Sequence, residues 1–489
     1  MSEYTYFFIW SIKNPIKFFI FFFNKASIFL NKFFIKKKLI KIMIKNKIKN
    51  LDNKIKLNKI NIIINLAGNK VYVKNKINWK QTFIDPESEE RLHRFSWIID
   101  LVSEPIVSQK EIDWCEEQIH DWYEKFFFEI EYLTKNNKKW FSYTVSERIA
   151  NIFLFYNKIN KQIPNSIKSN IELETIFLLN NLEYFKNSIN NHIINNSRAI
   201  FFSGIILKKR KFLLESKKIF LNNYKKLITK DGFLREGSSN YQLIFHRWII
   251  ELMYFSKNHD IQFHLLLFRL SKKLFNGSNF FIYNKKKKNV FNFGDISPDF
   301  KSEWIKTILN SNTKKKKISS WSNLLLTKKN NNLLVNNYFN KKDKIIDTYP
   351  KSGWYKFNKF SHQIMFKLSD VEPKFYPGHF HYDQGHFIYS YMNNIIFSDT
   401  GRYNYHNSKD YFAKDHNTLT INDLGLIPKN KHLPCEYLIS KNKIDVINNK
   451  EFLEIKISMS GFKRIKKKMI WIRKILIYKK KIVITDSIN

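Results

Sequence analysis

The residues best suited to chemistry gather between positions 378 and 418. His379 and His381 stand two positions apart, Asp399 follows two short apolar runs, and His416 precedes an asparagine. In a strand, His379 and His381 point to one face, and a hairpin after them returns Asp399 towards them. Imidazole and carboxylate ligands suit a borderline divalent ion such as zinc. The spacing therefore favours a metal-binding interpretation.

The alternative is that these are ordinary polar residues on a half-exposed sheet, which is the more common situation for any single histidine. The complete set argues against it, because further glycine and polar positions accompany the histidines. These are Gly378, Asp383, Gly401, Tyr405, Asn417 and Thr418. The intervening FIYSYMNNIIFSD consists of two apolar runs divided by Asn393-Asn394, which predicts a β-hairpin.

Three motifs in this stretch resemble the C-terminal domain of the heparinase II/III-like polysaccharide lyases. The family pattern is roughly G-H-x-H-x-D, then D-x-G-x-x-x-Y, then H-N-T, and the chain has these residues from Gly378, from Asp399 and from His416. The resemblance implies that His379 belongs to the active site. It also implies that His381, Asp399 and His416 hold one structural zinc ion.

The resemblance extends through shorter motifs nearer the N-terminus, so that it covers about residues 140–489. WFSYTVSERIANIF, NNHIINNSRAIFFSGIIL and DGFLREGSSNYQ are similar to three family segments, and FGD at 293–295 is similar to a family turn. Residue by residue, Asn191 matches the asparagine that binds the substrate carboxylate, His192 its neighbour, and Tyr241 the catalytic tyrosine. Three further positions are expected to bind substrate: Arg148, Glu236 and Tyr405.

The chain departs from the family pattern at Gln242, where histidine is frequent, and at Gly385-His386, where a small or hydroxyl residue is usual. These departures concern specificity more than chemistry. Each catalytic assignment also has a plainer alternative. Asn191 lies in an asparagine-rich run and can be a capping residue, and Tyr241 precedes an apolar helix and can be a core residue.

The resemblance implies β-elimination, in which the C5 proton of a uronic acid is removed and the 4-O-linked sugar is expelled. The substrate carboxylate must be neutralised, a base must accept the proton, and an acid must protonate the leaving oxygen. Asn191, with His192 nearby, is expected to hold the carboxylate as an oxyanion site does. Tyr241 and His379 are the candidate base and acid, in an order that depends on the epimer at C5.

A free tyrosine has a pKa of about 10, so a base role requires a nearby cation. Arg148, Arg235 or a charged histidine are the candidates, although Arg235 and Glu236 can equally form a surface pair of little consequence. The helical part contributes the asparagine and the tyrosine, and the C-terminal part contributes His379. We therefore expect the site in a cleft between two domains.

The elements that position these residues fall into two classes. From about 78 to 340, apolar residues recur at helical spacing, as in SEERLHRFSWIIDLV and SNYQLIFHRWIIELMYF. The succession of antiparallel helix pairs predicts an α/α solenoid or toroid, and the family resemblance implies an incomplete α/α toroid over 61–345. From 346 to 489 the period becomes two, in segments such as HQIMFKL, HFIYSY, TLTIND and KIVITD. These strands predict an antiparallel β-sandwich that is short at its C-terminal edge.

Residues 1–60 form a basic, apolar segment that lysines interrupt, so no apolar run reaches the ~20 residues of a membrane span. No convincing signal peptide is present, and an amphipathic helix docked on the rest of the protein or on a membrane surface is the better interpretation. The family resemblance favours the periplasm, whereas the missing signal favours the cytoplasm. The two cysteines, Cys115 and Cys435, indicate neither a disulfide framework nor a cysteine zinc site.

The chain has 85 Lys and Arg against 42 Asp and Glu, a formal net charge of +43. This charge suits an acidic polysaccharide, a nucleic acid or an acidic membrane, but scattered lysine runs also follow from a composition rich in Lys, Asn, Ile and Phe. No nucleic-acid motif is present. The family resemblance, which the charge supports only weakly, implies a carbon–oxygen lyase acting on an acidic glycan. The alternative is a non-catalytic glycan-binding or surface-polysaccharide biosynthesis protein of the same fold, and the oligomeric state stays open.

Overall fold

The structure is a computed structural model, and it describes residues 60–126, 137–184, 189–287, 289–300, 302–305, 308, 320–325, 344–368, 379, 381, 383–402, 413–426, 442–466 and 468–489. Two predictions fall outside these residues, namely the amphipathic segment before residue 60 and the substrate contact of Tyr405. Among the described helices, none combines the length and apolarity needed to cross a membrane.

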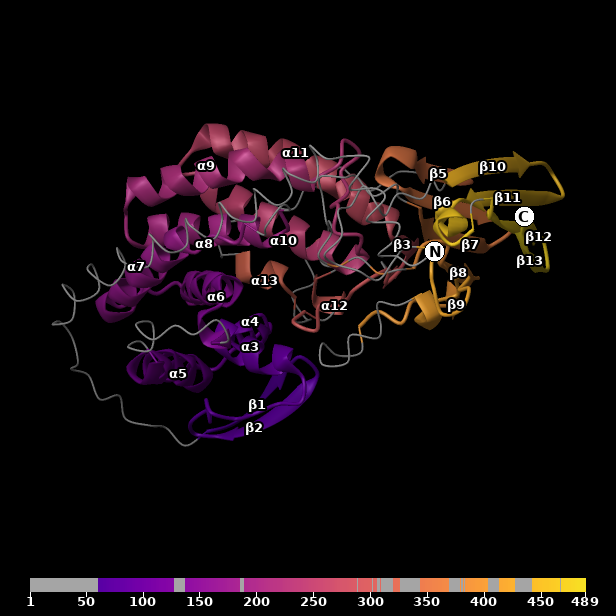
Figure 1. Ribbon diagram of the computed structural model, residues 1–489. Helices are drawn as coiled ribbons and strands as arrows, with labels where there is room; N and C mark the ends of the chain where they lie inside the picture. The colour runs from indigo at the N-terminus through magenta and orange to yellow at the C-terminus, as the bar shows by residue number, and fades with distance from the viewer. Residues whose placement is uncertain are drawn as a thin grey trace.

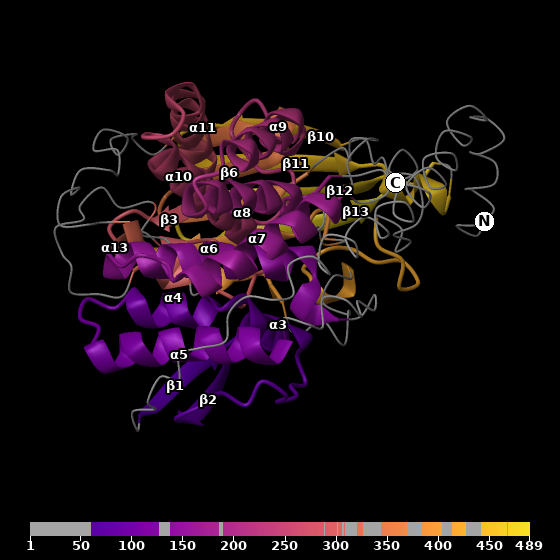
Figure 2. The ribbon, with the colours of Figure 1, turned by 90° about the vertical axis from the view of Figure 1, so that its left-hand side faces the viewer.

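The molecule has a helical part at one end and two β-sheets at the other (Figure 1), and in Figure 2, seen from the helical side, the sheets lie behind the helices. The predicted fold class, an incomplete helical toroid followed by an antiparallel sandwich, is confirmed. The main helices are α3 (Pro86–Arg94), α4 (Ser96–Val102), α5 (Gln109–Phe126), α6 (Ser142–Ile159), α7 (Asn165–Asn180), α8 (His192–Ile206), α9 (Arg210–Leu227), α10 (Ser239–Ser256) and α11 (Ile261–Phe280). Two single-turn helices follow, α12 (Ser302–Ile305) and α13 (Ser322–Leu325).

The helical part also contains two small hairpins, formed by β1 (Asn61–Leu66) with β2 (Asn69–Lys74) and by β3 (Ile282–Asn284) with β4 (Asn289–Val290). One predicted helix is interrupted. Phe95 has φ 60°, and this left-handed residue ends α3 and precedes α4. At the start of α3, the Asp85 side chain accepts the Glu87 N–H and Pro86 occupies the first turn, which is a common way to begin a helix.

Buried ion pairs join the three helices at the centre of the helical part. Arg198 of α8 contacts Glu147 of α6 at 2.7 Å and Glu251 of α10 at 2.6 Å. Arg247 of α10 lies 3.4 Å from Glu147. All four side chains are at most 1% exposed. Because breaking one partner would leave a buried unpaired charge, this network allows few alternative packings of α8 and α10, the helices that carry Asn191 and Tyr241.

The C-terminal part consists of two antiparallel sheets. Five strands follow one another in the first sheet: β5 (Ile346–Tyr349), β6 (Trp354–Lys359), β7 (His362–Lys367), β8 (Phe387–Tyr391) and β9 (Asn394–Phe397). Four strands form the second: β10 (Asn442–Asn448), β11 (Phe452–Met459), β12 (Trp471–Tyr478) and β13 (Ile482–Ile488). Strictly alternating burial along β12 reflects one face packed inwards and one turned outwards.

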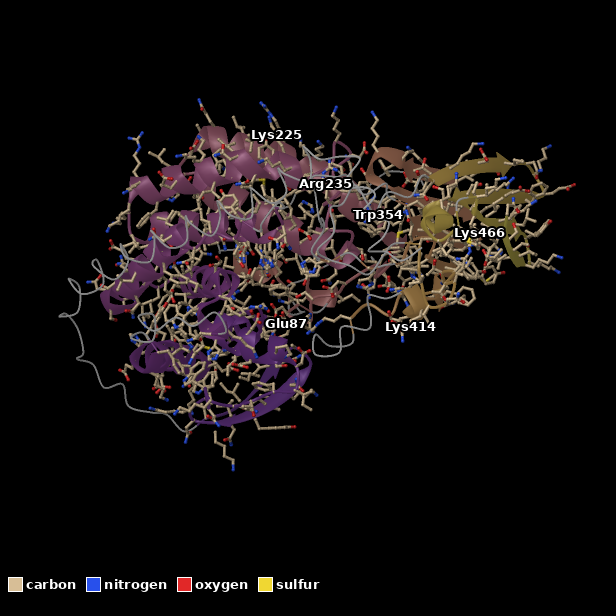
Figure 3. All side chains as sticks on the ribbon, viewed as in Figure 1. Glu87, Lys225, Arg235, Trp354, Lys414 and Lys466 are labelled. Atoms are coloured by element: carbon tan, nitrogen blue, oxygen red, sulfur yellow. The ribbon has the colours of Figure 1, made fainter. Side chains whose placement is uncertain are left out.

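Strands β6, β7 and β8 of the five-stranded sheet have buried side chains on both faces, and this joins the two domains. Phe357 and Phe366 pack into the sandwich core together with Ile455 of the second sheet. On the opposite face, Trp354 and neighbouring apolar residues pack against aromatic side chains such as Phe293. Trp354, labelled in Figure 3, lies where the sandwich meets the helical part. The apolar contact places the start of β8 beside the helical domain.

The predicted hairpin is confirmed. β8 pairs with β9 across Met392 and Asn393, whose φ angles of 50° and 64° are those of a tight two-residue turn. Two predictions about strands are wrong. The segment 418–423 forms only an isolated bridge between Ile421 and Leu424, and His379 lies outside any strand. Alternation of residue types marks strands only where a partner strand lies alongside.

A buried histidine on α10 makes a testable prediction about the helix that carries Tyr241. His246 lies 3.1 Å from the hydroxyls of both Ser271 and Ser278, and burial lowers its pKa from 6.5 to about 3. The unfolded chain therefore takes up a proton below pH 6.5 that the folded chain refuses, so stability falls as the pH falls through this window. In His246→Gln, the loss of unfolding free energy between about pH 7 and about pH 5 should be smaller by about 2 kcal/mol, measured by urea denaturation. An identical pH dependence of the unfolding free energy in the wild type and in His246→Gln would contradict this prediction.

Candidate active site

A short stretch between the domains, Phe293–Asp299, contacts nearly every part of the candidate site, and we call it the connecting segment. It follows β4 and is bound to the N-terminus of α10. The Ser239 N–H donates to the carbonyl of Phe293 at 3.0 Å, and the Phe293 N–H donates to the Ser239 hydroxyl at 2.9 Å. The Ser297 N–H donates to the Asn240 side chain at 3.0 Å. The residues just before Tyr241 are therefore fixed to this segment.

Tyr241 and His379 come together as the sequence predicted, in a stacked pair. Their ring centroids are 3.4 Å apart with 14° between the planes. His379 Nδ1 lies 2.8 Å from Oδ2 of Asp295, a residue of the connecting segment that is 1% exposed. An ionised carboxylate only accepts, so Nδ1 carries the hydrogen and Nε2 is the working nitrogen. Nε2 is buried and makes no hydrogen bond to the described residues.

Asn191 precedes α8 and is fully buried. Its backbone N–H donates to Oε1 of Glu236 at 2.8 Å, which ties it to the loop leading into α10. Neither the oxygen nor the nitrogen of its side-chain amide has a hydrogen-bond partner within the described part of the chain. Buried amides are rarely left in this state outside ligand sites. Glu236 is itself buried and acts on Asn191, which differs from the substrate contact predicted for it.

His192 is the most accessible of the predicted catalytic residues, with 24% of its side chain exposed. Its Nδ1 lies 3.0 Å from Glu183 Oε1, and its ring packs on Tyr143 with centroids 4.5 Å apart. The carboxylate and the aromatic ring hold the imidazole at the N-terminus of α8.

Arg148 has a structural position in place of the predicted contact with substrate. Its side chain is fully buried, and Nε lies 2.7 Å from Glu174 Oε1. The guanidinium also bonds the carbonyl of His93 at 2.9 Å and lies over the ring of Trp122 at 4.0 Å. A guanidinium paired in this way cannot also reach a substrate, so it is not the cation needed beside Tyr241. The ring that stacks on Tyr241 is that of His379.

The predicted metal ligands converge. His381 Nδ1 and His416 Nδ1 lie 3.9 and 3.7 Å from Asp399 Oδ1, and one donor atom from each residue falls within 4.8 Å of the others. Asp399 is held by two backbone N–H groups, from Gly294 at 2.8 Å and Gly401 at 2.9 Å. The connecting segment thus bonds the Asp399 carboxylate through Gly294 and the imidazole of His379 through Asp295.

Sequence reasoning missed three residues near the site. Asp295 was part of the FGD motif, but nothing in the sequence linked it to His379. His386 was noted only as a departure from the family pattern, yet its Nε2 lies 3.6 Å from Asp399 Oδ2. Lys367 gave no signal, although burial lowers its pKa to about 8 against the opposing effects of the Asp383 and Glu236 carboxylates.

The comparisons with known proteins agree with this arrangement. Residues 342–489 match the family model described as "Heparinase II/III-like, C-terminal". The predicted family resemblance is confirmed. The structure also resembles the crystal structure of heparinase III, with a TM-score of 0.58 and 16% identity over 84% of this chain. A second heparinase III, the BT4657 gene product, gives a TM-score of 0.51 and 15% identity over 84% of this chain.

The chain spans 65% and 66% of the lengths of these two heparinase III chains. At such identities the likeness establishes the fold, in which a helical part precedes a heparinase II/III-like domain. No curated protein matches the sequence. The activity of this chain is therefore argued from its own residues.

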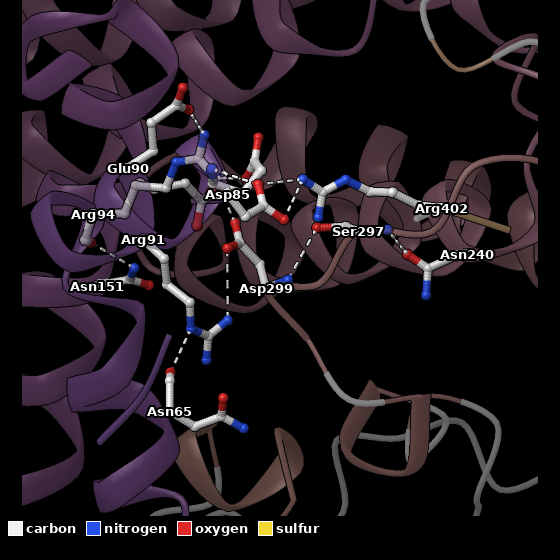
Figure 4. A network of polar contacts seen from close by, with 12 residues as sticks. Asn65, Asp85, Glu90, Arg91, Arg94, Asn151, Asn240, Ser297, Asp299 and Arg402 are labelled. Atoms are coloured by element: carbon white, nitrogen blue, oxygen red, sulfur yellow. Dashed lines mark hydrogen bonds and ion pairs between the residues drawn. The ribbon is translucent and has the colours of Figure 1, made fainter. Parts of the chain in front are cut away.

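Polar contacts at the end of the connecting segment attach the heparinase II/III-like domain to the first helices. Asp299 lies 2.7 Å from Arg94 and 3.6 Å from Arg91, both on α3. Arg402 lies three residues after Asp399 and donates to both oxygens of Asp85, at 2.7 and 2.9 Å. Figure 4 shows these groups together. The two domains are thus fixed around the site by charge-assisted hydrogen bonds.

Gly294 offers a test of the connecting segment. Its φ is +72°, and a Cβ there would lie 2.7 Å from the carbonyl oxygen of Gly237. Gly294→Ala should cost about 1 kcal/mol for the backbone conformation and about 1–3 kcal/mol for the overlap. Gly68→Ala is the matched control, because φ is +92° there but nothing lies within 4 Å of the added Cβ.

Chemical denaturation of both variants separates the two contributions. We expect Gly68→Ala to lose only about 1 kcal/mol. Equal losses in the two variants would show that the close approach of Gly294 to Gly237 does not constrain the connecting segment.

Proposed function

We propose that the protein is a polysaccharide lyase that cleaves a uronic-acid-containing acidic glycan by β-elimination. The observation that carries the proposal is the stacked pair of Tyr241 and His379, with Asp295 behind the imidazole. Two proton-transfer groups from different domains are held against each other, which a purely structural contact would not require. The fold likeness to two heparinase III structures supports the same class of reaction.

The substrate carboxylate is assigned to Asn191. The amide is buried and both of its polar atoms lack a hydrogen-bond partner among the described residues. A carboxylate that accepts from the amide nitrogen regains the hydrogen bond that burial removed. Hydrogen bonding strengthens as negative charge moves onto the carboxylate during C5 deprotonation, so it lowers the barrier more than it stabilises the bound substrate.

Proton transfer is assigned to Tyr241 and His379. Because Asp295 accepts from Nδ1, Nε2 of His379 can accept or donate a proton while the carboxylate stabilises the imidazolium. A charged imidazolium stacked 3.4 Å from the tyrosine ring favours the phenolate electrostatically. The pair can therefore act in either order, one residue removing the C5 proton and the other protonating the leaving oxygen.

We also propose that His381, Asp399 and His416 hold a structural zinc ion. Both ring nitrogens of His416 are buried without a hydrogen-bond partner in the described structure, and its side chain is 0% exposed. Two imidazoles and a carboxylate are donors that zinc prefers. Zinc bound there supplies a cross-link between the loops on either side of the β8–β9 hairpin. Asp295 and the loop that the bound ion fixes then orient His379.

The basic composition, with a net charge of +43, is suited to a polyanionic substrate because it raises the local concentration of negatively charged chains. The particular glycan and its sulfation pattern are not assigned. We retain the periplasm as the proposed compartment, on the family resemblance alone.

The direct test is ultraviolet absorbance of the unsaturated uronate on a panel of heparin, heparan sulfate, chondroitin, hyaluronan and alginate. We expect absorbance to rise on at least one polymer with the wild type and not with Tyr241→Phe. Tyr254→Phe, near the far end of the same helix, is the control and should retain activity.

A rise that survives in Tyr241→Phe would refute the role of Tyr241. No rise on any polymer with folded, zinc-loaded wild type would favour a non-catalytic glycan-binding protein.

Asp295→Asn tests separately whether Asp295 fixes the hydrogen of His379 on Nδ1. An amide can donate to Nδ1, which moves the hydrogen to Nε2 and removes the stabilisation of the imidazolium. We expect kcat to fall about 100- to 10,000-fold with a small change in KM, since general acid–base catalysis contributes about this much. Asp423→Asn, at an exposed position of the C-terminal domain, is the control. An unchanged kcat in Asp295→Asn would exclude Asp295 from the proton-transfer step.

A further inference from the structure

A fourth histidine lies beside the three residues assigned to the metal. His386 Nε2 is 3.6 Å from Asp399 Oδ2, while His381 and His416 approach the other oxygen, Oδ1, at 3.9 and 3.7 Å. The rings of His386 and His416 have centroids 5.0 Å apart. Three imidazoles therefore face the two oxygens of one carboxylate.

The surrounding backbone fixes which nitrogen of His386 carries the hydrogen. Asn417 Nδ2 donates to the carbonyl of Phe387 at 2.8 Å, and the Phe387 N–H donates to Asn417 Oδ1 at 2.9 Å, so this amide has one orientation. His386 Nδ1 lies 2.9 Å from the same Oδ1 and must donate to it. In the neutral imidazole, the lone pair is then on Nε2, the atom that faces Asp399.

Two acceptor atoms facing each other in a buried place repel unless a cation lies between them. His386 is 1% exposed, Phe293 packs on its ring, and Nε2 has no hydrogen-bond partner among the described residues. Ligand atoms around a tetrahedral zinc ion lie about 3.4 Å apart, given bonds of about 2.0–2.1 Å. The separations of 3.7 and 3.9 Å from Asp399 Oδ1 and of 3.6 Å from Asp399 Oδ2 are close to that value.

We propose that His386 binds the metal ion through Nε2, as a fourth protein ligand beside the three predicted ones. The proposal rests on the metal site put forward above. Four protein ligands leave no open position for water or substrate, which is the arrangement of a structural ion and not a catalytic one. Asn417 then positions His386, as residues behind metal-bound histidines commonly do.

The test measures metal binding by the full-length protein, without any turnover. We expect cobalt-loaded wild type to show the intense visible absorption of tetrahedral Co²⁺. His386→Gln should lose it and bind zinc about 100-fold more weakly or worse, because even a residue behind a ligand contributes about 10–100-fold. His362→Gln is the control, since that buried histidine bonds the Tyr389 hydroxyl at 2.8 Å within the same domain.

Unchanged zinc affinity and an unchanged cobalt spectrum in His386→Gln would overturn the proposal. A zinc X-ray absorption spectrum of the wild type decides the matter without any variant, because three imidazole ligands support the proposal and two refute it. Wild type that binds neither metal also refutes it. A four-ligand site in a protein without lyase activity would uphold this inference and refute only the proposed function.

Discussion

The hydrogen bonds of the connecting segment, Phe293–Asp299, are the constraint on which the rest of the site depends. Within this short stretch, Gly294 donates to Asp399 and Asp295 accepts from His379. The preceding residue, Phe293, is tied by two hydrogen bonds to Ser239 at the start of α10. Asp299 then pairs with arginines of α3. The connecting segment thus sets the positions of Tyr241, His379 and Asp399 relative to one another.

Hydrogen-bond acceptors at Nδ1 set the tautomers of two histidines at this site, His379 and His386. Asp295 assigns the hydrogen of His379 to Nδ1, and Asn417 does the same for His386. The two acceptors differ in charge, which matches the two proposed tasks. A carboxylate stabilises an imidazolium that takes up a proton, whereas a neutral amide favours the uncharged imidazole that a metal requires.

The cost of burying polar groups is distributed unevenly across the molecule. In the helical core, Arg198 lies between two glutamates and Arg148 pairs with Glu174, so burial is offset by charge and hydrogen bonding. At the site, the Asn191 amide is buried without that compensation among the described residues. An uncompensated buried polar group is a property of binding sites more than of cores.

The sequence by itself determined the elements and the motifs. Period and turn chemistry are local, so the β8–β9 hairpin followed from pattern. The proposed metal ligands Asp399 and His416, and the proposed pairing of Tyr241 with His379, followed from the family resemblance. Tertiary structure decided the partners. Asp295 reaches His379 across 84 residues, and Arg402 reaches Asp85 across 317. It also placed Arg148 in the core and His386 beside Asp399. Such contacts depend on how domains dock, and docking follows from the summed burial of many side chains, which no local spacing encodes.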